Sequence, residues 1–206
     1  MPAKMRRCLA SWHSRLLGYE FVLWDRTRVD GVGDAEFNRS WVTHWYGNRN
    51  YAFAADYIRL WALWREGGIY LDTDVEVLKP LDDLLNRDLL LGEERGTGAV
   101  EAAVIGATKG HAAIKAVLDS FGEFSDEPLP KRMRRVLPDI TLLPGEQLSP
   151  KDWRTGRLAV TDATYVIHHF AGSWLSRKER MAQLAGRHLG GWAVPVVRWI
   201  GHRFES

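Results

Sequence analysis

The chain has little cysteine, little net charge and no long apolar run, and each shortage excludes a class of protein. Cys8 is the only cysteine among 206 residues, so no disulfide framework can form within the chain and a reducing compartment fits. No run approaches the roughly 18 apolar residues of a membrane-spanning helix, and no secretory signal opens the chain. We therefore expect a cytoplasmic protein, soluble or at most peripheral at the inner face of the membrane.

Charge and composition also limit the partners and the number of domains. The formal net charge is +2, whereas a nucleic-acid partner would require a far stronger basic face, so no nucleic acid is expected. Hydrophobic residues make up 46% of the chain, enough for one substantial core. We predict one main domain over residues 1–175 and a helical extension over residues 176–206, either packed on that domain or peripheral to it.

The most informative stretch of the sequence runs from Tyr51 to Asp74. Its first part, up to Trp64, is apolar at nearly every position and lacks proline and glycine, which predicts a helix buried on most of its surface. Asp56 and Arg59 interrupt this apolar run. A buried charge costs several kcal/mol unless a partner or ligand meets it, so these two residues are candidate functional groups.

The second part of this stretch places two carboxylates at the end of a strand. The helix is predicted to end at Gly67-Gly68, and a short strand follows at once and runs into Asp72-Thr73-Asp74. Carboxylates this close repel each other unless a positive charge lies between them, and Mg²⁺ or Mn²⁺ accepts such oxygens while keeping positions open for phosphates. The alternative is that both are solvated turn residues and that the two charges of the helix pair with each other.

Together these residues carry a family resemblance. Asp56-x-x-Arg59 followed by Gly67-Gly68-x-Tyr70-x-Asp72-x-Asp74 resembles the signature of the D-x-D sugar-binding glycosyltransferases of the capsular polysaccharide and yeast initiating mannosyltransferase type. It is also similar to the catalytic domains of the large clostridial glucosylating toxins. The resemblance implies a Rossmann-like α/β fold of the glycosyltransferase A (GT-A) type.

The resemblance also implies roles for single residues. Asp56 and Arg59 are then expected to bind the donor sugar and its phosphates, and Tyr70 to pack near the nucleotide. Asp72 and Asp74 are expected to hold the metal ion and the ribose. We therefore expect Mn²⁺ or Mg²⁺ as the cofactor and a nucleotide-diphosphate sugar, with UDP or GDP as the nucleotide, as the donor.

A second motif late in the chain is also similar to the family pattern. His168-His169 precedes Phe-x-Gly-Ser173-Trp174. In this and related families a late residue completes the metal shell, and the resemblance implies that Ser173 and Trp174 meet the diphosphate and the leaving group. Imidazole suits Mn²⁺, and adjacent residues of a strand face opposite ways, so only one histidine is expected to reach the ion. Both remain candidates, and the alternative is that they are edge-strand histidines with structural hydrogen bonds.

The beginning of the chain departs from the family pattern. Lys4 to Leu17 is predicted to be a helix and Tyr19 to Trp24 a strand, followed by a helix from an Asp34 N-cap to Tyr46. In the family an apolar strand precedes the first helix and helps to bind the nucleotide base. Here Met1-Pro2-Ala3 stand where that strand would end, so we expect an N-terminally truncated version of the fold. Either the true start lies upstream, which we favour, or another element covers the gap.

Three further segments have weaker claims to function. Glu93 or Glu94, at the exit of a predicted strand, would be placed to touch an acceptor hydroxyl, although such a charge pair is commonly solvated. The basic run from Lys131 to Arg135 is expected to be a solvated face, with contact to an acidic acceptor or an anionic membrane as the alternative. Trp192 to Phe204 has the composition of an interfacial segment but is short and contains a proline, so folding back onto the domain is equally compatible.

These inferences lead to an expected function. We expect a metal-dependent glycosyltransferase that moves a hexosyl unit from a nucleotide-diphosphate sugar to a hydroxyl of a glycan or lipid-linked glycan, with retention, in polysaccharide or capsule synthesis. One alternative is a catalytically impaired fragment or a sugar-nucleotide-binding module. A metal-dependent phosphohydrolase is another, although two-metal sites need more acidic ligands than the sequence offers. The sequence does not specify donor sugar, base, linkage, acceptor or oligomeric state.

Overall fold

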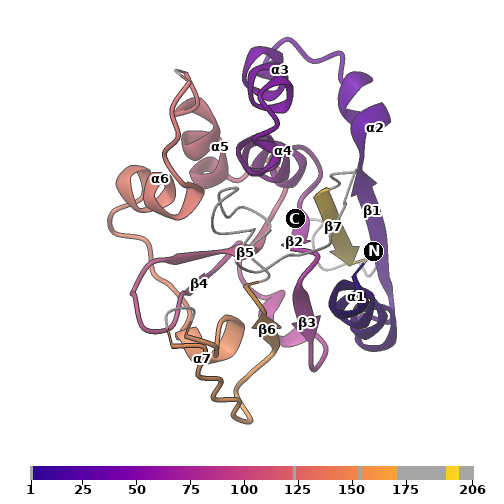
Figure 1. Cartoon of the computed structure of the whole chain (residues 1–206), viewed down its shortest axis with the longest axis vertical. Helices are drawn as coiled ribbons and strands as arrows, with labels where there is room; N and C mark the ends of the chain where they lie inside the picture. The colour runs from indigo at the N-terminus through magenta and orange to yellow at the C-terminus, as the bar shows by residue number, and fades with distance from the viewer. Residues whose placement is uncertain (1, 123, 153–154, 171–193, 200–206) are drawn as a thin grey trace.

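The computed structural model describes residues 2–122, 124–152, 155–170 and 194–199 of the chain (Figure 1). These residues form an α/β domain whose elements follow one another in the order α1 (Ala3–Arg15), β1 (Tyr19–Trp24), α2 (Arg26–Asp30), α3 (Arg39–Gly47), α4 (Tyr51–Glu66), β2 (Gly68–Leu71), β3 (Val75–Val77), the 3₁₀ turn η1 (Asp82–Leu84), β4 (Leu89–Glu93), β5 (Val100–Ala107), α5 (Ala112–Asp119), α6 (Leu129–Val136), α7 (Gly145–Leu148), β6 (Val166–His168) and β7 (Val194–Trp199).

Five strands form the central sheet, in the order β1-β7-β2-β5-β4. Strands β1, β2 and β4 run in one direction and β5 and β7 in the other, so every hydrogen-bonded pair among the described strands of this sheet is antiparallel. The crossover from β1 to the parallel strand β2 is made by α2, α3 and α4, as expected in an α/β domain. Among the described residues, a second sheet is formed by β3 and β6, paired antiparallel with Val75 opposite His168.

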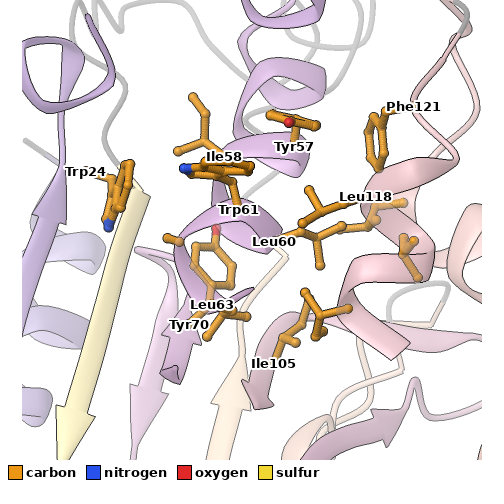
Figure 2. Packing of buried hydrophobic residues seen from close by; sticks show 14 of the residues in the cluster. Trp24, Tyr57, Ile58, Leu60, Trp61, Leu63, Tyr70, Ile105, Leu118 and Phe121 are labelled. Atoms are coloured by element: carbon orange, nitrogen blue, oxygen red, sulfur yellow. The ribbon is translucent and has the colours of Figure 1, made fainter. Parts of the chain in front are cut away.

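The central sheet separates two hydrophobic cores. Alternate residues of one strand point to opposite faces, and in β2 the side chain of Tyr70 enters the core under α3, α4 and α5 while Ile69 and Leu71 enter the core beside α1 and β3. In β7, Val196 and Val197 divide in the same way. Figure 2 shows the first core, where Leu60 of α4 lies beside Leu118 and the ring of Tyr57 packs against that of Phe121. Both faces of the sheet are therefore covered, which explains the apolar composition of its strands.

Helix α4 is buried on most of its surface, as its sequence predicts. Eight of its sixteen residues are buried, among them Arg59. The helix ends at Gly67, whose φ of 71° suits glycine, and a Cβ added there would lie 2.9 Å from the backbone nitrogen of Lys109. At Gly68, with φ of 109°, a Cβ would lie 2.6 Å from the carbonyl oxygen of Val197. The Gly-Gly pair therefore allows the chain to enter the sheet directly beside two other backbone segments.

Strand β5 has an irregularity that matters for the site. Its pairing with β4 runs regularly to Leu91 opposite Ile105, but the next residue, Gly92, is opposite Glu101. Residues 102–104 are therefore left out of this pairing, and Val104 and the carbonyl of Ala103 pair with β2 and Asp72 instead. Irregularities of this kind bend a strand and redirect its side chains, and they are frequent beside active sites.

The expected α/β fold is confirmed, with corrections to local detail. The third helix begins at Arg39 with Asn38 as its N-cap, because the Asn38 side chain accepts from the Trp41 N–H; the prediction of Asp34 as this N-cap was wrong. Residues 194–199, predicted within a helical extension, form strand β7 instead, since they pair on both sides with β1 and β2. The other residues from 176 on lie outside the described part, and the division at residue 175 stays a prediction.

One further finding concerns the membrane. In the part of the chain that the structure describes, no helix combines the length and the apolar character that crossing a bilayer requires.

Candidate functional site

Asp72, Asp74 and His168 form a cluster where β2 ends and β3 begins. Each offers one ligand atom, and these atoms all lie within 4.8 Å of one another. Asp74 directly precedes β3, and the pairing of Val75 with His168 brings the histidine of β6 beside it. The Nε2 atom of His168 lies 3.6 Å from Asp74 Oδ1. The pairing of β3 with β6 thus joins the early and late motifs into one site.

The second histidine faces away from this cluster. His169 Nε2 lies 2.8 Å from a carboxylate oxygen of Glu76, and the carbonyl of His169 accepts from Lys151 Nζ at 2.9 Å. The alternation of side chains along the strand separates the two imidazoles, as the sequence predicts, and His168 is the one that lies near Asp74. Which histidine binds metal is still a prediction, but the geometry favours His168.

Arg59 connects the helix charges to the aspartate pair. Its guanidinium lies 2.9 Å from Asp56 and 3.6 Å from Asp72, and it donates to the carbonyl of Ala102 at 2.8 Å. The guanidinium carbon also lies 4.3 Å from the ring centre of Tyr70. With a side chain only 8% exposed, Arg59 acts as a fixed internal positive charge rather than as a group projecting into solvent.

Tyr70 and Asp72 are coupled by a hydrogen bond. The Tyr70 hydroxyl donates to Asp72 Oδ1, and the Asp72 side chain remains 30% exposed, so it is open on its other side. Burial raises the pKa of Asp72, with Asp74 acting in the same direction and Arg59 opposing both. Burial likewise raises the pKa of Asp56 to about 6, while Arg59 lowers it. Each of these carboxylates is thus held in a position where its ionised form needs a positive partner.

Glu101 is a buried carboxylate in contact with the cluster. It is 2% exposed and one of its oxygens lies 3.1 Å from His168 Nδ1. Burial alone would lower the pKa of His168, but Glu101 together with Asp74 and Asp72 raises it to about 9. Without a metal ion His168 is therefore protonated at neutral pH and paired with carboxylates on both sides.

This pairing predicts a pH dependence of stability in the metal-free protein. A histidine pKa raised from 6.5 to about 9 contributes roughly 3 kcal/mol of stability, fully present below about pH 6.5 and lost as pH rises through about 9. Urea unfolding in a chelator at pH 6 and pH 9.5 should show this fall in the free energy of unfolding. The fall should persist in His13→Gln, an exposed histidine, and largely disappear in His168→Gln; an equal slope in both variants would contradict the assignment.

The residues present fit a divalent cation. Two carboxylates and one imidazole nitrogen form a donor set that suits Mn²⁺ in particular. Among the residues that the structure describes, the groups around the cluster carry more negative than positive charge once His168 is neutral. The carboxylates are Asp56, Asp72, Asp74 and Glu101, and the cations are Arg59, Arg132, which interacts with Asp56, and Lys151, which interacts with Asp74. A bound cation would remove this excess, and its binding would have to displace the proton of His168.

Other predicted residues lie near the cluster or outside the described part. Glu94 is half-buried, and its charge interacts with those of Glu101 and His168, which keeps it a candidate near the acceptor. Ser173 and Trp174 lie outside the described residues. Glu101 and Lys151 were missed by sequence reasoning; neither stands in a motif.

The basic run from Lys131 to Arg135 is not simply a solvated face. Arg132 is 2% exposed and donates to the carbonyl of Ser120 and to the hydroxyl of Ser125, and Arg135 is paired with Glu127 at 2.8 Å. The expectation of a solvated face was therefore wrong for Arg132, because its guanidinium has partners inside the domain.

Comparisons with known proteins agree with the motif residues. Residues 2–91 match a family model described as "Glycosyltransferase sugar-binding region containing DXD motif". Over 56 residues, 27% of this chain, the sequence is 43% identical to "Glucan organizing enzyme 1" of Cryptococcus neoformans var. grubii, and the alignment covers 15% of that protein.

A solved structure, "PaToxG Glycosyltransferase", is similar over 55% of this chain and 43% of that chain, with 24% identity and a TM-score of 0.39. The chain thus spans less than half the length of either relative. The matched family range contains Asp56, Arg59, Tyr70, Asp72 and Asp74. The family comparison thus agrees with the resemblance: residues 2–91 of the chain match the model of glycosyltransferase sugar-binding regions that contain a DXD motif.

Proposed function

We propose that this protein transfers a hexosyl unit from a nucleotide-diphosphate sugar, with UDP or GDP as the nucleotide, to a hydroxyl group of a glycan. The observation that carries the proposal is the convergence of Asp72, Asp74 and His168, whose ligand atoms lie within 4.8 Å of one another. The two aspartates belong to the residues that match the DXD family model, and His168 lies beside them. A glycosyltransferase needs such a site because its leaving group, a nucleoside diphosphate, departs with accumulated negative charge.

The roles of the chain's own residues follow from their positions. Asp72 and Asp74 would hold Mn²⁺ or Mg²⁺ through carboxylate oxygens and His168 through Nε2. When bound, the cation supplies Lewis-acid stabilisation of the charge that develops on the diphosphate. Arg59 supplies a fixed positive charge behind Asp72 that needs no reorganisation during the reaction.

Asp56 and Tyr70 are assigned to donor positioning. The Asp56 carboxylate is held by Arg59 and retains 15% exposure, so one edge of it is open to a sugar hydroxyl. Tyr70 fixes Asp72 through its hydroxyl group. When these residues hold the donor sugar with its anomeric carbon toward the acceptor, a bimolecular reaction becomes an effectively unimolecular one. We include retention of the anomeric configuration in the proposal, on the basis of the family resemblance.

The acceptor and the cellular context are also proposals. A glycan or lipid-linked glycan acceptor in polysaccharide or capsule synthesis, and a cytoplasmic location, peripheral at the inner face of the membrane, fit a nucleotide-sugar donor. Glu94 is the candidate for contact with the acceptor, because its charge interacts with those of the metal-site residues His168 and Glu101.

The proposal is tested by incubating the protein with Mn²⁺ and a panel of UDP- and GDP-hexoses, with and without oligosaccharide acceptors. We expect release of the nucleoside diphosphate from one donor, faster with an acceptor, and abolished by chelation. Release of inorganic phosphate without a glycoside product would instead identify a phosphohydrolase. Calorimetric binding of a nucleotide sugar without turnover would identify a binding module, and neither binding nor turnover with any donor would refute the proposal.

A further inference from the structure

Glu101 is a buried carboxylate for which the family motifs provide no role. It lies in β5 and is 2% exposed. Burying an ionised carboxylate costs several kcal/mol unless its oxygens are well hydrogen-bonded, so a carboxylate kept at this depth calls for a physical reason.

Both oxygens of Glu101 accept hydrogen bonds. Oε1 accepts from the backbone N–H of Ala103 at 2.8 Å, and Oε2 lies 3.1 Å from His168 Nδ1. The irregularity of β5 lies at the same place, because it takes residues 102–104, including Ala103, out of the regular pairing with β4. The strand thus presents the carboxylate to the imidazole in one fixed orientation.

The contact determines which nitrogen of His168 can bind a ligand. An ionised carboxylate only accepts, so the Nδ1 atom of His168 must carry the hydrogen. In the neutral imidazole the lone pair is then on Nε2, the atom that lies 3.6 Å from Asp74 Oδ1. The ring of Phe170, with its centroid 3.9 Å from that of His168, packs against the same imidazole and limits its rotation.

We propose that Glu101 is a positioning residue that holds His168 in the tautomer and orientation in which Nε2 faces a divalent cation shared with Asp72 and Asp74. Metal-bound histidines are commonly held in this way by a carboxylate on their other nitrogen, and loss of that carboxylate weakens metal binding about 10- to 100-fold. The proposal rests on the metal site of the proposed function, and it assigns to β5 a part in that site.

The chain contains a matched control for this role. Glu76 of β3 and His169, which directly follows β6, form the same kind of carboxylate–imidazole contact, at 2.8 Å. This second pair faces away from Asp72 and Asp74. Neutralising either glutamate removes the same charge from the same kind of contact. Glu76 is the more exposed of the two, at 22% against 3%, and also lies 3.8 Å from Arg7, so the tautomer of His168 is needed as a second readout.

Glu101→Gln is an informative substitution because glutamine has one acceptor oxygen where glutamate has two. It can accept from His168 or from Ala103, but not from both, while keeping the shape of the side chain. Mn²⁺ should be titrated calorimetrically into the wild type, Glu101→Gln and Glu76→Gln. We expect a 10- to 100-fold rise in Kd for Glu101→Gln and a change of less than about 3-fold for Glu76→Gln.

A second measurement separates positioning from a general effect on folding. In protein with ¹⁵N-labelled histidine and saturating Mg²⁺, which is diamagnetic, the His168 signals should report the Nδ1–H tautomer in the wild type and in Glu76→Gln, and a mixture of tautomers in Glu101→Gln. Glu101→Asp, which keeps two acceptor oxygens on a shorter stem, should recover part of the affinity.

The outcomes are distinct. Wild-type Mn²⁺ binding with equal affinity in Glu101→Gln, or an unchanged tautomer there, overturns the role of Glu101 and leaves the proposed function standing. Equal weakening in both glutamine variants also overturns it, because the effect would then be one of charge alone. Absence of Mn²⁺ binding by the wild type overturns the metal site and the role of Glu101 together.

Discussion

Replacing Asp74 with alanine is expected to lower the turnover number for nucleotide-sugar cleavage by on the order of 10³-fold. The cation bound by this residue is worth several kcal/mol of charge stabilisation on the leaving diphosphate, and each 1.36 kcal/mol corresponds to a factor of ten in rate. The side chain of Asp74 is only 12% exposed and points toward His168, so its loss also removes a side-chain contact between the early and late motifs. Initial rates over a range of Mn²⁺ concentrations provide the measurement.

The control for this prediction is Asp83→Ala, which removes an exposed aspartate from the short turn after β3. It has the same change of charge, and its rate should stay within about 2-fold of the wild type because surface substitutions of this kind have small effects. Circular dichroism should show that both variants are folded. Full activity of Asp74→Ala in the presence of a chelator would contradict the metal mechanism.

Replacing Arg59 with methionine is expected to lower the free energy of unfolding by about 3–5 kcal/mol, because it leaves two partly buried carboxylates without their shared partner. Those carboxylates are Asp56 and Asp72, at 2.9 and 3.6 Å from the guanidinium. Methionine preserves most of the apolar volume, so the loss is one of charge and hydrogen bonds. For a chain of this size the change corresponds to roughly 6–20 °C in Tm, measurable by calorimetry.

Arg65→Met is the matched control on the same helix. Arg65 pairs with Asp34 at 3.1 Å, but its side chain is 50% exposed, so the pair is screened by solvent and its loss should cost less than about 1 kcal/mol. Equal destabilisation by the two substitutions would show that burial around Arg59 does not strengthen its ion pairs. The double variant Arg59→Met, Asp56→Asn provides an independent check. It should recover part of the lost free energy of unfolding, because it removes one of the two carboxylates left without a partner.

Local sequence patterns predicted the elements that surround the site. The strand Tyr19–Trp24 has the predicted bounds, and the apolar run from Tyr51 gives the helix α4 that ends at the predicted glycine pair. These elements could be predicted because they depend on hydrophobic periodicity and on the backbone conformations of glycine, both of which are local properties of the sequence. The start of α3 was misplaced because Asp34 and Asn38 are both good N-cap residues and only tertiary packing chooses between them.

The candidate site could be predicted only in part. The motifs identified Asp72, Asp74 and the histidine pair, and strand alternation predicted that one histidine alone would reach the aspartates. Which one does so depends on the register between β3 and β6, which pairs Val75 with His168. Glu101 could not be found, because a regular strand would not have turned its carboxylate toward His168. The irregularity that does so follows from long-range pairing with β2 and β4.

The position of β7 has a consequence for how the protein is made. This strand lies between β1 and β2, with Tyr19 opposite Trp199 and Ile69 opposite Val197, yet a ribosome synthesises it after every other described element (Figure 1). Until then two strands of the nascent polypeptide have open edges that face each other across a gap, and open edges invite pairing with other chains. Completion of the sheet therefore waits until synthesis has passed Trp199, the last residue of β7.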